Sequence, residues 1–98
     1  MLIFAKMEKG TQELQMENEV ILVGASWCGA CKMMHDWFLG IEIPGVTMRY
    51  ADISELPEEH VISLPTILFM ENGNEIQRVT GALTKGDLTG KIRSLFKI

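Results

Sequence analysis

The chain has 98 residues, enough for a single domain (1–98) with one hydrophobic core. Nine basic and thirteen acidic residues give a net charge of −4, which argues against a general nucleic-acid-binding protein. No apolar run approaches the length of a membrane span, and the first residues lack the basic region and cleavage site of a signal peptide. We therefore expect a cytoplasmic protein without a membrane partner.

The first half of the chain predicts strands and helices in alternation. Residues 2–7 form a short apolar stretch that predicts a strand, and a short helix capped by Thr11 follows. Residues 20–24 are four aliphatic residues and a glycine, which is typical of a strand buried on both faces. Residues 29–39 carry apolar side chains at helical spacing, and Gly40 is the expected stop.

Two further segments complete the parallel part. Residues 46–53 alternate between apolar and polar side chains, which predicts a strand. Strand, helix and strand in this order predict a parallel crossover connection between residues 20–24 and 46–53. The acidic segment 54–60 follows, and we expect one or two helical turns after Pro57.

The last third of the chain predicts a hairpin and a helix. Residues 66–70 and 76–80 flank the turn signal Asn72-Gly73. The final helix has Thr84 as its expected cap, and its apolar face consists of Leu88, Ile92, Leu95 and Phe96. The whole order predicts an α/β fold with a central mixed sheet of four to five strands and helices on both faces.

Trp27-Cys28-Gly29-Ala30-Cys31 lies where the strand 20–24 gives way to a helix, and it holds both cysteines of the chain. A bridge across so short a loop would stabilise the fold little, so the pattern favours a redox pair over a structural cross-link. A helix N-terminus favours negative charge, so the Cys28 thiolate is expected to be stabilised there. We expect Cys28 to attack a disulfide and Cys31, one turn deeper, to resolve the mixed disulfide.

Four motifs in the right order and spacing resemble the thioredoxin family. Residues 27–32 match its W-C-G-P-C-K except for Ala30, and Leu64-Pro65-Thr66 matches its I-P-T, whose proline is cis. Asn72-Gly73 matches its hairpin turn, and residues 81–86 are close to its G-A-L-S-K-G. The resemblance covers residues 20–95. It implies a thioredoxin-like fold and a dithiol–disulfide oxidoreductase that reduces protein disulfides.

The resemblance also implies partners and site residues. It implies disulfide-containing protein substrates, a flavoprotein of the thioredoxin-reductase type as electron donor, and a monomer. It implies no cofactor beyond the Cys28–Cys31 redox centre. Pro65, in the cis form, would turn the backbone of residue 64 towards the cysteines, where it would pair with an extended substrate. The implied substrate groove contains Trp27, Gly29, Ala30, Leu64, Pro65, Thr66 and Gly81, with Thr80 and Ala82 beside them.

The sequence departs from the family at positions that matter for proton transfer. The buried aspartate usual six residues before the first cysteine is Leu22, and the lysine that accompanies it on the next strand is replaced by Tyr50. The helix has Asp36 where the family has a proline. His35 stands four residues after Cys31, on the same helical face, and is a candidate proton relay. An ordinary helix histidine is the alternative interpretation of His35.

Other functions remain open from the sequence. A metal site would use Cys28, Cys31 and His35 with His60 as a distant fourth ligand, but the second ligand cluster usual in structural zinc sites is absent. A thioredoxin-fold binding scaffold without turnover is a second alternative. A disulfide oxidase or isomerase in an oxidising compartment is a third. A glutaredoxin is the weakest, since Ala30 stands where that family usually has tyrosine.

Overall fold

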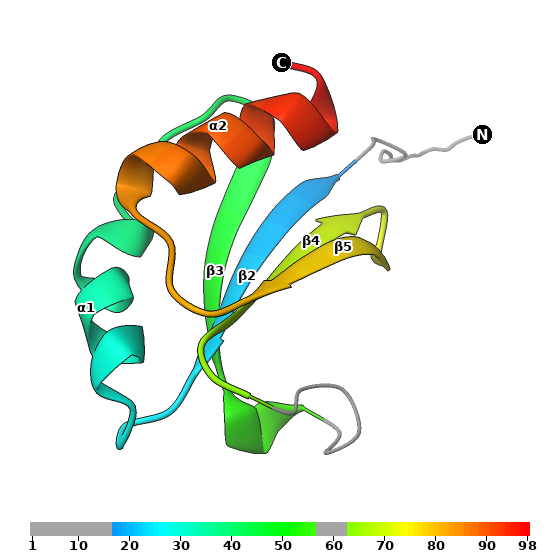
Figure 1. Ribbon diagram of the computed structural model, residues 1–98. Coiled ribbons are helices and arrows are strands. Elements are labelled where there is room, and N and C mark those ends of the chain that lie inside the picture. The colour runs from blue at the N-terminus through cyan, green and yellow to red at the C-terminus, as the bar shows by residue number, and fades with distance from the viewer. Residues whose placement is uncertain (1–16, 57–62) are drawn as a thin grey trace.

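The computed structural model of the protein describes residues 17–56 and 63–98. The expected strand at 2–7, the helix capped by Thr11 and the helical turns after Pro57 lie outside these residues. Every other predicted element is present, with bounds within two residues of the prediction. In the labels of Figure 1 they are β2 (Asn18–Gly24), α1 (Gly29–Phe38), β3 (Val46–Asp52), the 3₁₀ turn η1 (Ile53–Glu55), β4 (Thr66–Glu71), β5 (Asn74–Thr80) and α2 (Lys85–Phe96).

The four described strands form one mixed sheet in the order β3-β2-β4-β5 (Figure 1). β2 pairs in parallel with β3 and antiparallel with β4, and β4 pairs antiparallel with β5. β2 lies inside the sheet because its aliphatic residues suit burial on both faces, and every residue from Val20 to Gly24 is buried. The predicted mixed α/β sheet is confirmed.

Asn72 and Gly73 form the turn between β4 and β5. Both have positive φ angles, 54° and 83°, as a two-residue type I′ turn requires. The Glu17 amide donates to Asn72 Oδ1, and the Asn72 amide donates to the Glu17 carbonyl oxygen, both at 2.8 Å. The hairpin tip is thereby tied to the residue just before β2.

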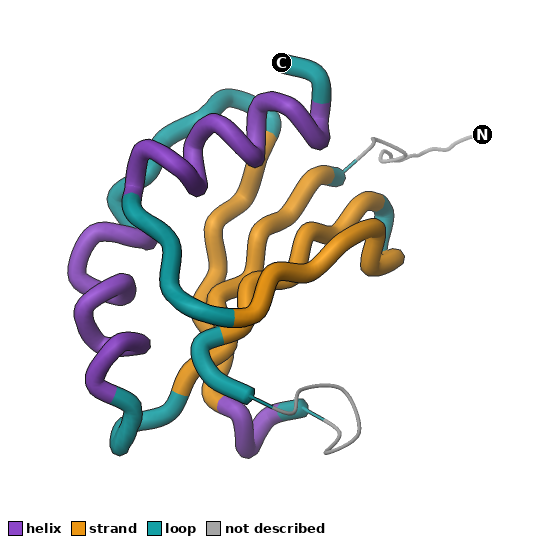
Figure 2. Tube along the Cα trace, in the orientation of Figure 1, coloured by secondary structure: helices purple, strands orange, loops and turns teal. Residues whose placement is uncertain are grey.

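The two α-helices cover the same face of the sheet (Figure 2). Alternate residues of β2 divide the core: Val20 and Leu22 pack under the helices with Phe38 and Leu88, whereas Ile21 and Val23 belong to a smaller cluster on the opposite face. Residues of η1 and of the segments beside it pack on that smaller cluster. The segments expected to place a helix there, at Thr11 and after Pro57, lie outside the described residues.

Helix α2 begins where the sequence predicts it. Thr84 has an extended backbone, and its Oγ1 accepts a hydrogen bond from the Asp87 amide at 3.1 Å. Leu88, Ile92 and Phe96 are buried from this helix. Neither described helix is long and apolar enough to span a membrane.

Candidate active site: the Cys28–Cys31 pair

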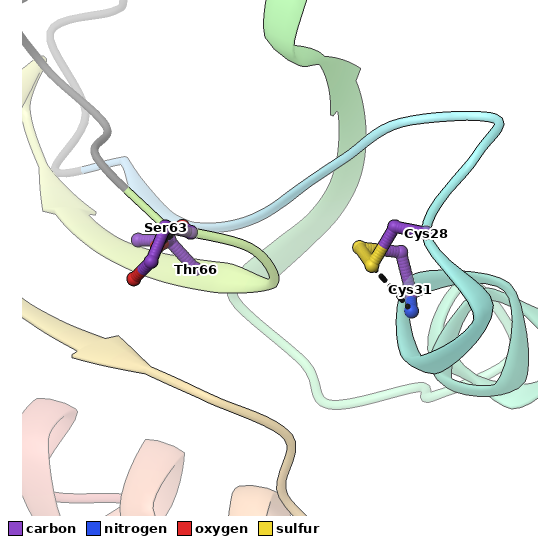
Figure 3. Close-up of a disulfide and its surroundings, with 4 residues drawn as sticks. All are labelled: Cys28, Cys31, Ser63 and Thr66. Carbon is purple, nitrogen blue, oxygen red and sulfur yellow. Dashed lines mark hydrogen bonds between the residues drawn. A yellow bond between two sulfur atoms is a disulfide. The ribbon is translucent and has the colours of Figure 1, made fainter.

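The cysteine pair lies at the end of β2 where the chain turns into α1. β2 ends at Gly24, the Cys28 amide donates to the Ala25 carbonyl oxygen at 3.1 Å, and α1 starts at Gly29. Cys28 and Cys31 form a disulfide with their Cα atoms 5.2 Å apart (Figure 3). The expected strand-to-helix junction and the proximity of the two sulfurs are both confirmed.

Cys28 is the N-cap of α1. Its backbone is extended, and its Sγ accepts a hydrogen bond from the Cys31 amide at 3.2 Å, drawn in Figure 3. The cap position is where side-chain acceptors satisfy the free amides of a helix start, and a negative charge is stabilised there by the same amides. The Cys28 sulfur therefore sits at a position that favours negative charge.

The two sulfurs differ in access. Cys31 is 1% exposed and faces the sheet with Met34 and Phe38, whereas Cys28 is partly exposed and follows Trp27, which is 75% exposed. Of the two sulfur-bearing residues, Cys28 is therefore the one that solvent can reach. The predicted burial of the second cysteine is confirmed.

A loop before β4 lies at the same end of the sheet. Thr66 is paired with Val23, the last residue but one of β2, and the Leu64–Pro65 peptide bond is cis, as the resemblance implied. Figure 3 shows the sulfur atoms on the side of the helix start that faces this loop. Thr66 is fully buried, and its Oγ1 donates to the Ser63 carbonyl oxygen at 2.6 Å. Its side chain thus holds the loop from within.

Gly81 joins this loop from the end of β5. Its amide donates to the Pro65 carbonyl oxygen at 2.7 Å, so the two segments are held together through their backbones. Gly81 has a φ of +100°, a conformation that disfavours residues with a Cβ. A Cβ added there would meet no atom within 4 Å, so the space beside it is open. The glycine is required by the backbone and leaves that space unfilled.

An apolar pocket of about 400 Å³ lies between α1 and the segment before α2. Ala30 and Ala82 border it, together with Met33 and Leu83. Met33 is 71% exposed although it is apolar. The sequence analysis did not place Met33 and Leu83 at the site. The signal for Met33 was an apolar side chain one helical turn after Ala30, on the side of α1 that faces solvent. Leu64, expected in the groove, packs its side chain against the smaller core cluster.

Tyr50 and His35 form an aromatic pair close to the disulfide. Tyr50 of β3 is directly opposite Leu22 of β2, so these two positions are neighbours in the sheet. The His35 and Tyr50 ring centroids are 4.4 Å apart, with the planes inclined by 45°. Burial, reinforced by the charges of Asp52 and Glu55, raises the pKa of the Tyr50 phenol.

No cluster of three or more potential metal ligands occurs within residues 17–56 and 63–98. Cys28 and Cys31 are bonded to each other, and the His35 ring packs on Tyr50. His60, the fourth ligand of the alternative metal site, lies outside the described residues.

Comparison with known proteins agrees with the geometry. The sequence model of the Thioredoxin family matches residues 3–94. Thioredoxin H2 of Arabidopsis thaliana is 30% identical over 99 residues (93% of this chain, 74% of the relative), and a thioredoxin of Chlamydia pneumoniae is 39% identical over 74 residues (69% and 72%). The oxidised mitochondrial thioredoxin 3 of Saccharomyces cerevisiae superposes with a TM-score of 0.67 at 30% identity, covering 80% of this chain and 78% of the yeast chain.

Proposed function

The chain belongs to the thioredoxin family and is a dithiol–disulfide oxidoreductase of the protein-disulfide reductase type, and from this premise we propose a distinct role for each cysteine. Cys28 is the attacking nucleophile and Cys31 is the resolving thiol. The observation that carries the assignment is the asymmetry of the pair: the Cys28 sulfur caps α1 and is partly exposed, whereas Cys31 is buried. The redox-active group is the pair itself, and no further cofactor takes part.

The proposed reaction has two exchange steps. The Cys28 thiolate attacks one sulfur of a substrate disulfide, so that a mixed disulfide forms, the substrate bond breaks, and the other substrate sulfur leaves as a thiolate that takes up a proton. The Cys31 thiolate then attacks the Cys28 sulfur. The Cys28–Cys31 bond forms, the mixed disulfide breaks, and the second substrate thiol leaves. Two electrons have passed to the substrate.

The proposed substrate groove follows the edge that joins α1 to the Pro65 loop. Trp27, Gly29 and Ala30 border it on the helix side. Pro65 and Gly81 border it opposite, with the backbone of Leu64 available to pair with an extended substrate and Thr66 supporting the loop from below. The hydrogen bond between the Gly81 amide and the Pro65 carbonyl oxygen supports this arrangement, because it joins the two segments that form the side of the groove opposite α1.

His35 is the proposed proton relay for Cys31. It is exposed and lies one helical turn after Cys31. A neutral imidazole there would accept the Cys31 proton before the second attack. His35→Ala is expected to shift the pH dependence of substrate reduction, and an unchanged profile would contradict the relay.

The electron donor is inferred from the family alone. We propose a flavoprotein of the thioredoxin-reductase type as donor, a monomer in the cytoplasm, and no nucleic-acid or membrane partner. The proposed donor is supported if such a reductase consumes NADPH only when both this chain and a protein disulfide are present. Failure of the reductase to reduce Cys28–Cys31 would contradict it.

Reduction of insulin disulfides by dithiothreitol tests the function. The wild-type chain is expected to accelerate the reaction, and Cys28→Ser is expected to abolish the acceleration. Cys31→Ser should instead accumulate a mixed disulfide through Cys28, because the resolving thiol is absent. No acceleration by the wild-type chain over the reagent alone would favour a binding scaffold without turnover, and a strongly oxidising midpoint potential would favour an oxidase.

A further inference from the structure

Gly24 leaves a small gap between the resolving cysteine and Tyr50. A Cβ added to Gly24 would lie 2.8 Å from Cys31 Cβ, 3.1 Å from Cys31 Sγ and 2.9 Å from the Tyr50 hydroxyl oxygen. The sulfur and the hydroxyl therefore border one gap of about the size of a methyl group. Because Gly24 has no side chain, no Cβ fills the space between the two groups.

The position of Tyr50 follows from the sheet. β3 runs parallel to β2, and Tyr50 is in register with Leu22, whose side chain lies under α1 in the larger core cluster. Tyr50 packs against the same cluster, so its ring lies on the helix-covered face. Its hydroxyl reaches the level of Gly24, two residues further along β2, where Cys31 comes down from the first turn of α1.

We propose that the Tyr50 hydroxyl donates a hydrogen bond to Cys31 Sγ when the disulfide is reduced, and so stabilises the thiolate that attacks Cys28. This rests on the proposed resolving role of Cys31. Leu22 offers no polar atom at this place, so of the paired residues Leu22 and Tyr50 only the phenol can donate a hydrogen bond into the gap that Cys31 Sγ borders. Hydrogen bonds to a charged acceptor are the strong ones, and they act most where water is excluded.

The titratable groups around Tyr50 come from three elements and keep the phenol in its donor form. Asp52 of β3 and Glu55 of η1 add negative charge, and with burial they raise the pKa of Tyr50. His35 of α1 packs on the ring, and Cys31 of α1 borders the hydroxyl. The raised pKa favours the protonated phenol, which is the form that can donate a hydrogen bond. The phenol gives no proton to the sulfur; the Cys31 proton leaves to His35 or to water.

His35 positions Tyr50 in this arrangement. Its ring lies 4.4 Å from the Tyr50 ring, centroid to centroid, and both it and Cys31 belong to α1. Helix α1 thus contacts the Tyr50 ring through His35 and carries the Cys31 sulfur one turn earlier. Tyr50→Phe keeps the ring and its contact with His35 and removes the hydroxyl alone, so it isolates the hydrogen bond.

The first experiment measures the pKa of Cys31 without turnover. In Cys28→Ser the remaining thiol is Cys31, and its thiolate absorbance or alkylation rate is followed against pH with and without Tyr50→Phe. Loss of a hydrogen bond to a charged sulfur is expected to raise the Cys31 pKa by roughly one pH unit. Thr47→Val, which removes an exposed hydroxyl from the same strand, is the matched control and should leave the pKa unchanged. An equal Cys31 pKa in folded Tyr50→Phe would overturn the proposal.

The second experiment needs no substitution. Tyr50 is the one tyrosine in the sequence, so the near-ultraviolet absorbance of tyrosinate reports on it alone. A thiolate that accepts its hydrogen bond should raise the pKa of Tyr50 in the reduced protein above that in the oxidised protein. Identical tyrosine titrations in the two redox states would overturn the proposal, whether or not Tyr50→Phe folds.

The third experiment separates the two exchange steps. With Cys28 loaded as a mixed disulfide with thionitrobenzoate, release of the coloured thiol reports the attack by Cys31. Tyr50→Phe should slow this release about threefold at pH values below the Cys31 pKa, because a roughly tenfold loss of thiolate is partly offset by the higher nucleophilicity of a more basic thiolate, while the first attack by Cys28 keeps its rate. Failure of the wild-type chain to reduce insulin would contradict the proposed function. The Cys31 and Tyr50 titrations would still show whether the hydrogen bond between these two residues forms. Slowing of both steps alike would overturn a role specific to Cys31.

Discussion

Leu22 of β2 and Tyr50 of β3 stand directly opposite each other in the parallel strand pair. Leu22 is fully buried in the larger core cluster, and Tyr50 reaches from the same cluster to the gap at Gly24. The thioredoxin pattern has an ionisable pair at these two positions, and this chain has an aliphatic residue and a phenol. The two paired positions therefore hold uncharged side chains, which has consequences for the stability of the fold and for the proposed exchange at Cys31.

Restoring the carboxylate by Leu22→Asp is expected to destabilise the protein at neutral pH. The site is 0% exposed, and burial of an unpaired charge in an apolar cluster is expected to cost about 3 kcal/mol or more of unfolding free energy. Burial would raise the folded-state pKa of the new carboxyl above its ordinary value of about 3.9. The folded state would then hold a proton that the unfolded state has lost, so the loss of stability grows as pH rises through this interval.

Urea unfolding at acid and at neutral pH measures this effect. Leu22→Asn is the matched control, because it has a similar size and polarity but does not titrate. Its loss of stability should be the same at both pH values. If the loss of unfolding free energy in Leu22→Asp were as independent of pH as in Leu22→Asn, the prediction of a buried carboxyl with a raised pKa would be contradicted.

Gly24→Ala tests the gap beside the disulfide. A methyl group would come within 3 Å of both Cys31 Cβ and the Tyr50 oxygen, so the start of α1 or the tyrosine has to move. Overpacking of this kind typically costs about 1–3 kcal/mol of unfolding free energy. Gly29→Ala, where an added Cβ would meet nothing within 4 Å, is the stability control. Equal unfolding midpoints for the two variants in urea would contradict the close approach.

Gly90→Ala is expected to stabilise the protein. Gly90 is exposed within α2, and a Cβ there would meet no atom within 4 Å. Alanine in a helix interior is favoured over glycine by about 1 kcal/mol.

Gly73→Ala is expected to destabilise the protein by about 1 kcal/mol of unfolding free energy, because Gly73 has a φ of +83° in the hairpin turn. Thermal unfolding of both variants checks the signs, and a shift in the same direction for both would contradict this interpretation.

Asp52 should contribute stability that depends on pH. The Ser54 hydroxyl and amide donate to its Oδ2 at 2.6 Å and 3.0 Å, and these hydrogen bonds lower the pKa of the carboxyl. The contribution is complete above the ordinary pKa of 3.8 and is lost as pH falls through the lower folded-state pKa. The difference in urea midpoint between wild type and Asp52→Asn should therefore shrink in strong acid. A difference that stays constant with pH would contradict it.

The sequence predicts the described elements because their signals are local. Residues 20–24 have too many aliphatic side chains for an exposed strand, Asn72-Gly73 suits a type I′ turn, and Thr84 is a capping residue. The cis bond before Pro65 has no such signal, since few X-Pro bonds are cis, and its prediction came from the family resemblance.

The arrangement around Cys31 could not be predicted in the same way. A glycine after a strand is an ordinary terminator, and the gap at Gly24 exists only once α1 has packed over β2. The contact of His35 with Tyr50 joins a helix to a strand fifteen positions away and depends on the register of β2 with β3. The exposure of Met33 beside the apolar pocket likewise depends on where the segment before α2 passes.

The pH dependence of alkylation in the reduced wild-type protein tests most directly whether Cys28 leads the exchange. A sulfur at the cap of α1 that accepts the Cys31 amide should ionise well below the ordinary cysteine pKa of about 8.5. Peptide mapping should find the label on Cys28 first, with buried Cys31 protected. Alkylation that follows a midpoint near that of free cysteine, or that reaches Cys31 before Cys28, would contradict the assignment.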